Sequence, residues 1–269
     1  MSQKHKSKKT LSSPDEKLWK RISSKFGKDE DKWDMVWDSS KIYSFFVEKE
    51  KLKLDNKESK QLKSKIDEIL ANSKKKRQWF LHKQNGEYIL TQSNIYVELN
   101  CEDIETIDFT NKTNDSVILN EFSEFNSENS LLDEMQYNGT LEYIFGETIK
   151  YGSFLGGRHR VYFKTILDEE IIEINGTQIE IDSCYETEKS IFIIEAKNKF
   201  YENFNIRQLY YPYKYIYDRL KKKNIEKNIY CIFLHKDNEN LYYHKYSWTN
   251  PNKMMDIIEI EKKMINLYC

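Results

Sequence analysis

The sequence has little proline, glycine or cysteine for its length. Among 269 residues there are three prolines, eight glycines and four cysteines. The cysteines, at positions 101, 184, 231 and 269, are widely spaced and form no CxxC motif, so we expect free thiols in a reducing, cytoplasmic compartment. The five histidines, at positions 5, 82, 159, 235 and 244, are also far apart, which argues against zinc chemistry.

Several other features are absent. No apolar run reaches the roughly 18 residues of a membrane-spanning helix, and no secretory signal is visible, so no membrane partner is expected. There is no P-loop, hence no nucleotide cofactor, and no GxSxG or HExxH motif. The 43 basic and 44 acidic residues leave a net charge of -1, so no overall basic field indicates nucleic acid.

The most informative stretch is residues 178–197, which reads as two strands joined by a polar connector at 184–189. The first strand covers 178–182. The second, 190–197, is an apolar run that ends in Glu195-Ala196-Lys197. Side chains alternate along a strand, so Glu195 and Lys197 share one face and Ala196 points to the other. If the two strands pair as a hairpin, Asp182 comes level with Glu195, and two carboxylates and an amine meet at a strand edge.

Such a cluster suits Mg²⁺, which takes carboxylate, water and phosphate oxygens. The stretch resembles the active-site hairpin of the PD-(D/E)XK nuclease superfamily, with Asp182 followed by Glu195-Ala196-Lys197; Ile181 stands where the motif has proline. The resemblance implies that Asp182 and Glu195 ligate Mg²⁺ and that Lys197 orients or deprotonates the attacking water. The alternative is that all three are ordinary surface residues of a charged chain.

The elements around this stretch support the resemblance. The sequence predicts a helix at 127–145, strands at 160–166, 178–182 and 190–197, a helix at 204–221 and a strand at 228–234. This order matches the αβββαβ core of the superfamily. A further strand at 241–248 and a closing helix at 254–267 follow. The predicted fold is therefore α/β (α+β), a restriction-endonuclease-like core with a central mixed sheet after a mainly helical N-terminal region.

Three more residues are candidates for the site. Members of the superfamily often add an acid from the helix before the first strand, which here is Glu128, with Glu134 and Glu142 as competitors. Glu180 lies two residues before Asp182 and shares its face. Gln208 opens the next helix, where RecB-like members carry a supporting glutamine with a tyrosine one turn later; here Pro212 takes the tyrosine position. Each could instead be a plain surface residue.

Candidate DNA contacts are basic residues in two places. Arg158 and Arg160 follow a Gly-Gly pair, and arginine can grip phosphate or guanine with two hydrogen bonds. Lys76 and Arg77 end a basic run beside two aromatic residues. A flexible turn and a solvated helix end are the alternatives.

The chain divides into three predicted parts. Residues 1–13 form a basic, disordered tail. Residues 14–115 carry predicted helices at 14–27, 33–49 and 57–71, a hairpin at 78–90, a strand at 94–99 and a polar linker at 100–116; this part is a candidate DNA-recognition region. Residues 116–269 form the predicted nuclease core.

The resemblance implies a type II restriction endonuclease: a Mg²⁺-dependent enzyme that cuts both strands of a specific site in double-stranded DNA. One active site per chain then implies a homodimer. Two alternatives stay open. One is a repair or recombination nuclease of the same superfamily that recognises DNA structure. The other is a non-catalytic DNA-binding protein in which the hairpin carboxylates are structural.

Overall fold

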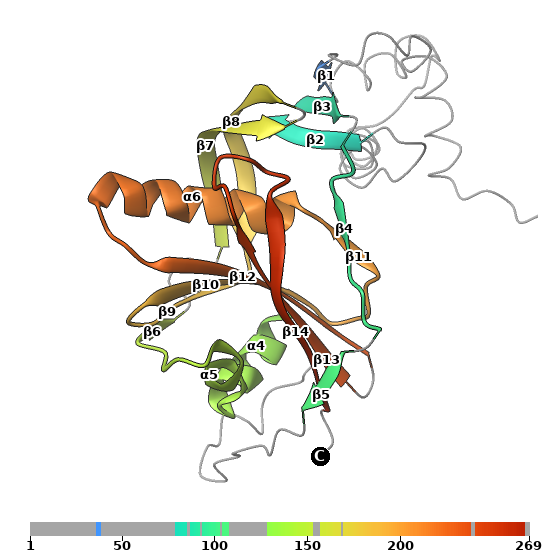
Figure 1. Cartoon of the computed structure of the whole chain (residues 1–269), viewed down its shortest axis with the longest axis vertical. Coiled ribbons are helices and arrows are strands. Elements are labelled where there is room, and N and C mark those ends of the chain that lie inside the picture. The colour runs from blue at the N-terminus through green and yellow to red at the C-terminus, as the bar shows by residue number, and fades with distance from the viewer. Residues whose placement is uncertain are drawn as a thin grey trace, which may run out of the picture. The chain divides into compact units, whose positions relative to one another are not determined.

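The structure is a computed structural model, and it describes residues 36–38, 79–84, 87–91, 93–102, 104–107, 128–152, 157–167, 169–237 and 240–266. The chain splits into two compact units (Figure 1). The first comprises Met1–His82 and Gly86–Gln92, and the second comprises Lys83–Asn85 and Ser93–Cys269. Each unit is considered by itself below.

The first unit contains a small antiparallel sheet. Its strands are β1 (Val36–Asp38), β3 (Glu87–Thr91) and β2 (Trp79–Gln84), in that order across the sheet. The hairpin predicted at 78–90 is therefore confirmed. The helix predicted at 33–49 is wrong where β1 lies, because these residues pair with β3. The tail, the helices predicted at 14–27 and 57–71, and Lys76 and Arg77 lie outside the described residues.

The second unit is a mixed α/β structure built on a seven-stranded sheet. The strand order is β5-β14-β13-β12-β10-β9-β6. The bounds are β5 Glu105–Ile107, β6 Tyr151–Gly152, β9 Ser183–Glu186, β10 Ser190–Lys197, β12 Asn228–Lys236, β13 Asn240–Trp248 and β14 Ile257–Asn266. Strands β10 and β12 are parallel, and the helix α6 (Arg207–Lys223) makes the crossover that such a pair requires.

Helices cover both faces of this sheet, with α6 on one side and α4 (Glu128–Tyr137) and α5 (Thr140–Phe145) on the other (Figure 1). Side chains along β10 point alternately to the two faces of the sheet, and both sets are apolar enough to pack against helices. Phe192, Ile194 and Ala196 lie in the core cluster with α4 and α5, and Phe192 stacks on Phe145 at 4.0 Å. Residues 191, 193, 195 and 197 therefore face α6. The predicted helix at 127–145 is confirmed, with its break at Asn138-Gly139, where Gly139 has φ of 82°.

A long hairpin lies outside the central sheet. Strands β7 (Gly157–Leu167) and β8 (Glu170–Ile181) form a two-stranded sheet of their own, and Ile166 of β7 adds an isolated bridge to Lys253. The hairpin packs on α6, where the Thr165 and Tyr210 hydroxyls are 2.7 Å apart. The strands predicted at 160–166 and 178–182 are thus present, but they pair with each other outside the central sheet. The hairpin expected between 178–182 and 190–197 is therefore wrong, because β9, which lies partly in the expected connector at 184–189, pairs with β10 instead. The edge position beside β9 is taken by β6.

Two predictions near the ends of this unit are wrong. The linker expected at 100–116 contains the strand β5, which pairs with β14. The strand predicted at 94–99 is confirmed as β4 (Tyr96–Glu98), which pairs with β11 (Asn203–Asn205). The closing helix expected at 254–267 is the strand β14, which pairs along its whole length with β13. Within the described residues, no helix is long and apolar enough to cross a membrane.

Candidate active site

The bend between β8 and β9 places Asp182 beside the end of β10. Strand β9 runs antiparallel to β10 with Ser183 opposite Ile194, so the preceding residue, Asp182, lies level with Glu195. The backbone N–H of Ala196 donates a hydrogen bond of 2.9 Å to Oδ2 of Asp182. The carboxylate is therefore fixed against the strand that carries the other two residues of the motif.

Lys197 lies at the centre of the acidic side chains. Its Nζ is 2.9 Å from Oε1 of Glu195, 3.4 Å from Oε1 of Glu128 and 3.8 Å from Oδ2 of Asp182. Nζ also donates to the carbonyl of Ala196 at 2.7 Å. The side chains of Asp182, Glu195 and Lys197 are only 12–16% exposed, whereas that of Glu128 is 38% exposed. The helix α4, the bend at Asp182 and strand β10 thus contribute to one cluster.

Gln208 in the first turn of α6 holds Glu195 from the other side. Its Nε2 donates to Oε1 of Glu195 at 2.7 Å, while its Oε1 accepts from the backbone N–H of Asn205 at 3.2 Å. The second bond fixes which end of the amide points to the carboxylate. Gln208 therefore acts as a positioning residue for Glu195.

Burial and the neighbouring charges set the protonation of the pair at the end of β10. Burial raises the pKa of Glu195 to about 7, although the ammonium of Lys197 opposes this shift. For Lys197, burial lowers the pKa, but the carboxylates of Glu195, Asp182 and Glu128 outweigh burial and raise it above its usual range. Lys197 is consequently charged at neutral pH.

These residues line a cavity of about 370 Å³. Strand β8 contributes Glu180 to its wall, and α6 contributes Arg207 and Tyr211 as well as Gln208. Sequence reasoning missed Arg207 and Tyr211 as site residues. The position of Gln208 was a signal for Tyr211, because residues three apart on a helix share a face; it gave no signal for Arg207.

The two arginines of the hairpin lie on its exposed face. Arg158 and Glu180 are cross-strand partners, with Nε of Arg158 3.7 Å from Oε2 of Glu180 and side chains 69% and 63% exposed. Arg160 donates from Nη1 to the carbonyl of Gly176 at 3.2 Å. Glu180 therefore links the hairpin to the cavity, whereas the arginines do not contact the carboxylate cluster through any of these bonds.

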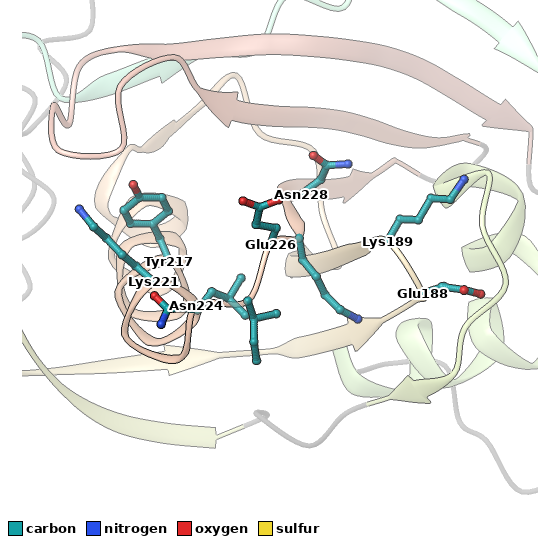
Figure 2. A pocket seen from close by; sticks show the side chains of 10 residues that line it. Glu188, Lys189, Tyr217, Lys221, Asn224, Glu226 and Asn228 are labelled. Carbon is teal, nitrogen blue, oxygen red and sulfur yellow. The ribbon is translucent and has the colours of Figure 1, made fainter.

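A second hollow, of about 780 Å³, lies where α6 ends and β12 begins. Figure 2 shows Tyr217, Lys221 and Asn224 on the helix side and Glu188 and Lys189 on the side of the turn between β9 and β10. At its edge, Lys227 pairs with Glu186 at 2.6 Å. Charges of both signs are mixed here, and the carboxylates do not converge as they do around Lys197, so this hollow is a weaker candidate.

The fold and the cluster together define a class: a mixed α/β protein with a carboxylate–lysine centre at the end of a sheet strand. The chain belongs to the family described as a domain of unknown function, DUF6997, whose profile matches residues 91–265. That match covers the sheet, α4 to α6 and every residue of the cluster. No curated protein and no solved structure matches the chain.

Proposed function

We propose that this protein is a Mg²⁺-dependent endonuclease that hydrolyses phosphodiester bonds of double-stranded DNA, most like a type II restriction endonuclease of the PD-(D/E)XK superfamily. One observation carries the proposal: Asp182, Glu195 and Lys197 converge in a cavity at the end of β10. A parallel strand pair joined by the crossover helix α6 surrounds them, as the resemblance implies.

The donor set fits a divalent cation. Three carboxylates surround one ammonium, so the cluster carries two more negative than positive charges when all its groups are ionised. Carboxylate oxygens are the ligands that Mg²⁺ prefers. Asp182 and Glu195 would hold the ion, with Glu128 as a third acid. Bound Mg²⁺ would neutralise the charge that develops on the scissile phosphate.

Lys197 acts as a hydrogen-bond donor in this reaction. Because the surrounding carboxylates keep it charged, it donates to the attacking water or to a phosphate oxygen and does not serve as the base. Water forms a bond to phosphorus as the bond to the leaving sugar oxygen breaks; the water gives its protons to solvent, and the leaving oxygen takes one proton from solvent to become a hydroxyl. Gln208 keeps Glu195 in position through its hydrogen bond of 2.7 Å.

Basic side chains near the cavity would hold the DNA backbone. Arg207 lies in the cavity wall, and Arg158 and Arg160 lie on the adjoining hairpin. The exposed pair of Arg158 with Glu180 is weak in water, so a phosphate can replace the carboxylate. Cutting both strands with one site per chain requires a homodimer, which matches a two-fold symmetric DNA site.

The contact between Gln208 and Glu195 favours a second candidate, a structure-specific repair or recombination nuclease. A supporting glutamine at this helix position is the feature shared with RecB-like members of the superfamily. Tyr211, three residues after Gln208, also lies in the cavity wall, although Pro212 stands at the position of the tyrosine in RecB-like members. The two candidates differ in substrate and not in chemistry.

The test is digestion of a mixed-sequence plasmid and of branched, flapped and single-stranded oligonucleotides, each with Mg²⁺ and with EDTA. Discrete plasmid fragments support the restriction activity, whereas cutting of branched or flapped DNA alone supports the second candidate. Mg²⁺-independent DNA binding, with no cutting of any substrate by the folded protein, would refute both and leave the non-catalytic alternative.

Asp182→Asn should abolish cutting because it removes a ligand charge, yet it keeps a side-chain oxygen for the Ala196 amide. The matched control is Glu188→Gln, which changes an exposed acid at the far end of β10. Equal cutting by wild type and Asp182→Asn would contradict the assigned site.

A further inference from the structure

A second group of ligand-type side chains lies on the other half of the sheet. Strands β12 and β13 are antiparallel, with Phe233 opposite His244 and His235 opposite Tyr242. The two histidines are therefore diagonal neighbours on one face, with ring centroids 5.4 Å apart. Cys101, which lies between β4 and β5, completes the group, and one ligand atom of each residue lies within 4.8 Å of the others.

The histidines are enclosed, and one of their nitrogen atoms lacks a partner. His235 and His244 are both fully buried. The Nδ1 atom of His235 accepts the backbone N–H of Tyr201 at 3.2 Å, whereas Nε2 has no hydrogen-bond partner within the described part of the chain. Buried polar atoms are nearly always satisfied, so an orphaned imidazole nitrogen beside a thiol and a second imidazole indicates a missing ligand.

The surrounding residues orient His244 and Cys101. The Nδ1 atom of His244 is 2.9 Å from Oε1 of Glu259, an arrangement that leaves Nε2 to face the Cys101 sulfur at 4.0 Å. A carboxylate behind a ligating histidine is the usual support of a metal site. Lys262 donates to the carbonyls of Asn100 and Glu102 at 3.1 and 3.3 Å and so fixes the loop on both sides of Cys101.

From this geometry we infer that Cys101, His235 and His244 bind a Zn²⁺ ion that fastens the β4–β5 loop to strands β12 and β13. Sulfur and imidazole nitrogen are ligands of Zn²⁺, whereas Mg²⁺ takes oxygen. A neutral imidazole that accepts at Nδ1 carries its proton on Nε2, so metal binding at Nε2 requires the proton to move to Nδ1 and the hydrogen bond from the Tyr201 N–H to break. Cys101 is more than 130 residues from either histidine, which is why the sequence showed no zinc motif.

This site is independent of the proposed nuclease centre because it shares no residue with it. The test uses the purified full-length chain, stripped of metal with a chelator and then titrated with Co²⁺ and with Zn²⁺. Wild type should bind one Co²⁺ with a thiolate-to-cobalt charge-transfer band in the near ultraviolet. Zn²⁺ should displace the band and raise Tm.

Cys101→Ala should lose the charge-transfer band and the Zn²⁺-dependent rise in Tm. This partly exposed position lets the variant fold, which a circular dichroism spectrum checks. Cys184→Ala is the matched control and should keep both signals. Asp182→Asn should keep them as well, even where it abolishes Mg²⁺-dependent cutting. Absence of the band in wild type, or its persistence in Cys101→Ala, would overturn the inference.

Discussion

Lys197 compensates for charge in the carboxylate cluster, and this role can be separated from the catalytic role that we propose for it. Its Nζ lies within 4.0 Å of three carboxylates. In Lys197→Met the carboxylates lose their only ion-pair partner in the cluster. Mg²⁺ should then bind more tightly and raise Tm more than in wild type, whereas cutting should fall by roughly 10²- to 10³-fold, the usual cost of removing one preorganised hydrogen-bond donor.

The measurement is a pair of Mg²⁺ titrations, one read by Tm and one by cutting rate. Lys222→Met, an exposed change in the last turn of α6, is the matched control and should behave as wild type. Weaker Mg²⁺ binding by Lys197→Met than by wild type would show that the Lys197 ammonium does not compete with Mg²⁺ for the carboxylates.

Gln208 would affect the proposed Mg²⁺ ion through Glu195. Its amide donates to the carboxylate and is itself oriented by the Asn205 backbone. Gln208→Leu keeps much of the side-chain volume but removes both bonds. The Mg²⁺ concentration that gives half-maximal cutting should rise about 10- to 100-fold, the usual cost of losing such a support, while saturating Mg²⁺ should restore most of the rate.

Gln136→Leu, an exposed change on α4, is the control for the added apolar surface. A loss of rate in Gln208→Leu that saturating Mg²⁺ does not restore would mean that Gln208 acts on the substrate and does not position Glu195.

At the scale of elements, the turn between β9 and β10 is fastened by Glu147. Its two carboxylate oxygens accept hydrogen bonds from the hydroxyls of Thr187 and Ser190, at 2.5 and 2.6 Å. Burial opposes the charge, but these two bonds hold the pKa of Glu147 below its ordinary value. A lowered carboxyl pKa stabilises the fold above the pKa of the unfolded chain, about 4.3, and the stabilisation is lost as pH falls below it.

Glu147→Gln should therefore lower Tm at pH 7 by about 2–4 °C, a small effect because the carboxylate is partly exposed to solvent. The difference from wild type should shrink as pH falls from 5 to 3. Thermal melts at a series of pH values measure this. A difference that stays constant across the series would show that the charge of Glu147 does not contribute.

The elements that sequence reasoning located are those whose pattern is local. The apolar run before Glu195 and the helix that begins near Gln208 each leave a signal within a few residues. Asp182 lies level with Glu195 as expected, but for a different reason: β9, which pairs with β10, begins directly after Asp182 and occupies part of the expected connector at 184–189. The predicted candidates that the structure brings together around Lys197 are those of the stretch 178–197 and of the two flanking helices.

The elements that sequence reasoning misjudged depend on distant partners. Residues 254–267 carry charged and apolar side chains that fit a helix, but pairing with β13 makes them a strand. Buried and exposed side chains alternate along β7 as predicted, but this pattern does not show that its partner is β8 rather than a strand of the central sheet. The Cys101, His235 and His244 group exists only because the sheet brings together positions more than 130 residues apart.

At the scale of the whole molecule, the near balance of 43 basic and 44 acidic residues limits how the protein can hold DNA. Long-range attraction to phosphate is weak at a net charge of -1, so binding must come from local groups beside the cavity, such as Arg207. Few local contacts also mean a modest loss of affinity with added salt. A second subunit would double those contacts, which is one physical reason to expect the active form to be a dimer.

A dimer with one centre per chain predicts a specific result when subunits are mixed. Wild type and Asp182→Asn, combined and allowed to exchange subunits, should form mixed dimers that cut only one strand at each site. Nicked circular plasmid should then accumulate beyond the level given by either protein alone, and gel electrophoresis of the products measures it. A simple dilution of wild-type cutting, with no nicked product, would mean that each chain works alone and that its single carboxylate–lysine centre cuts the two strands in turn.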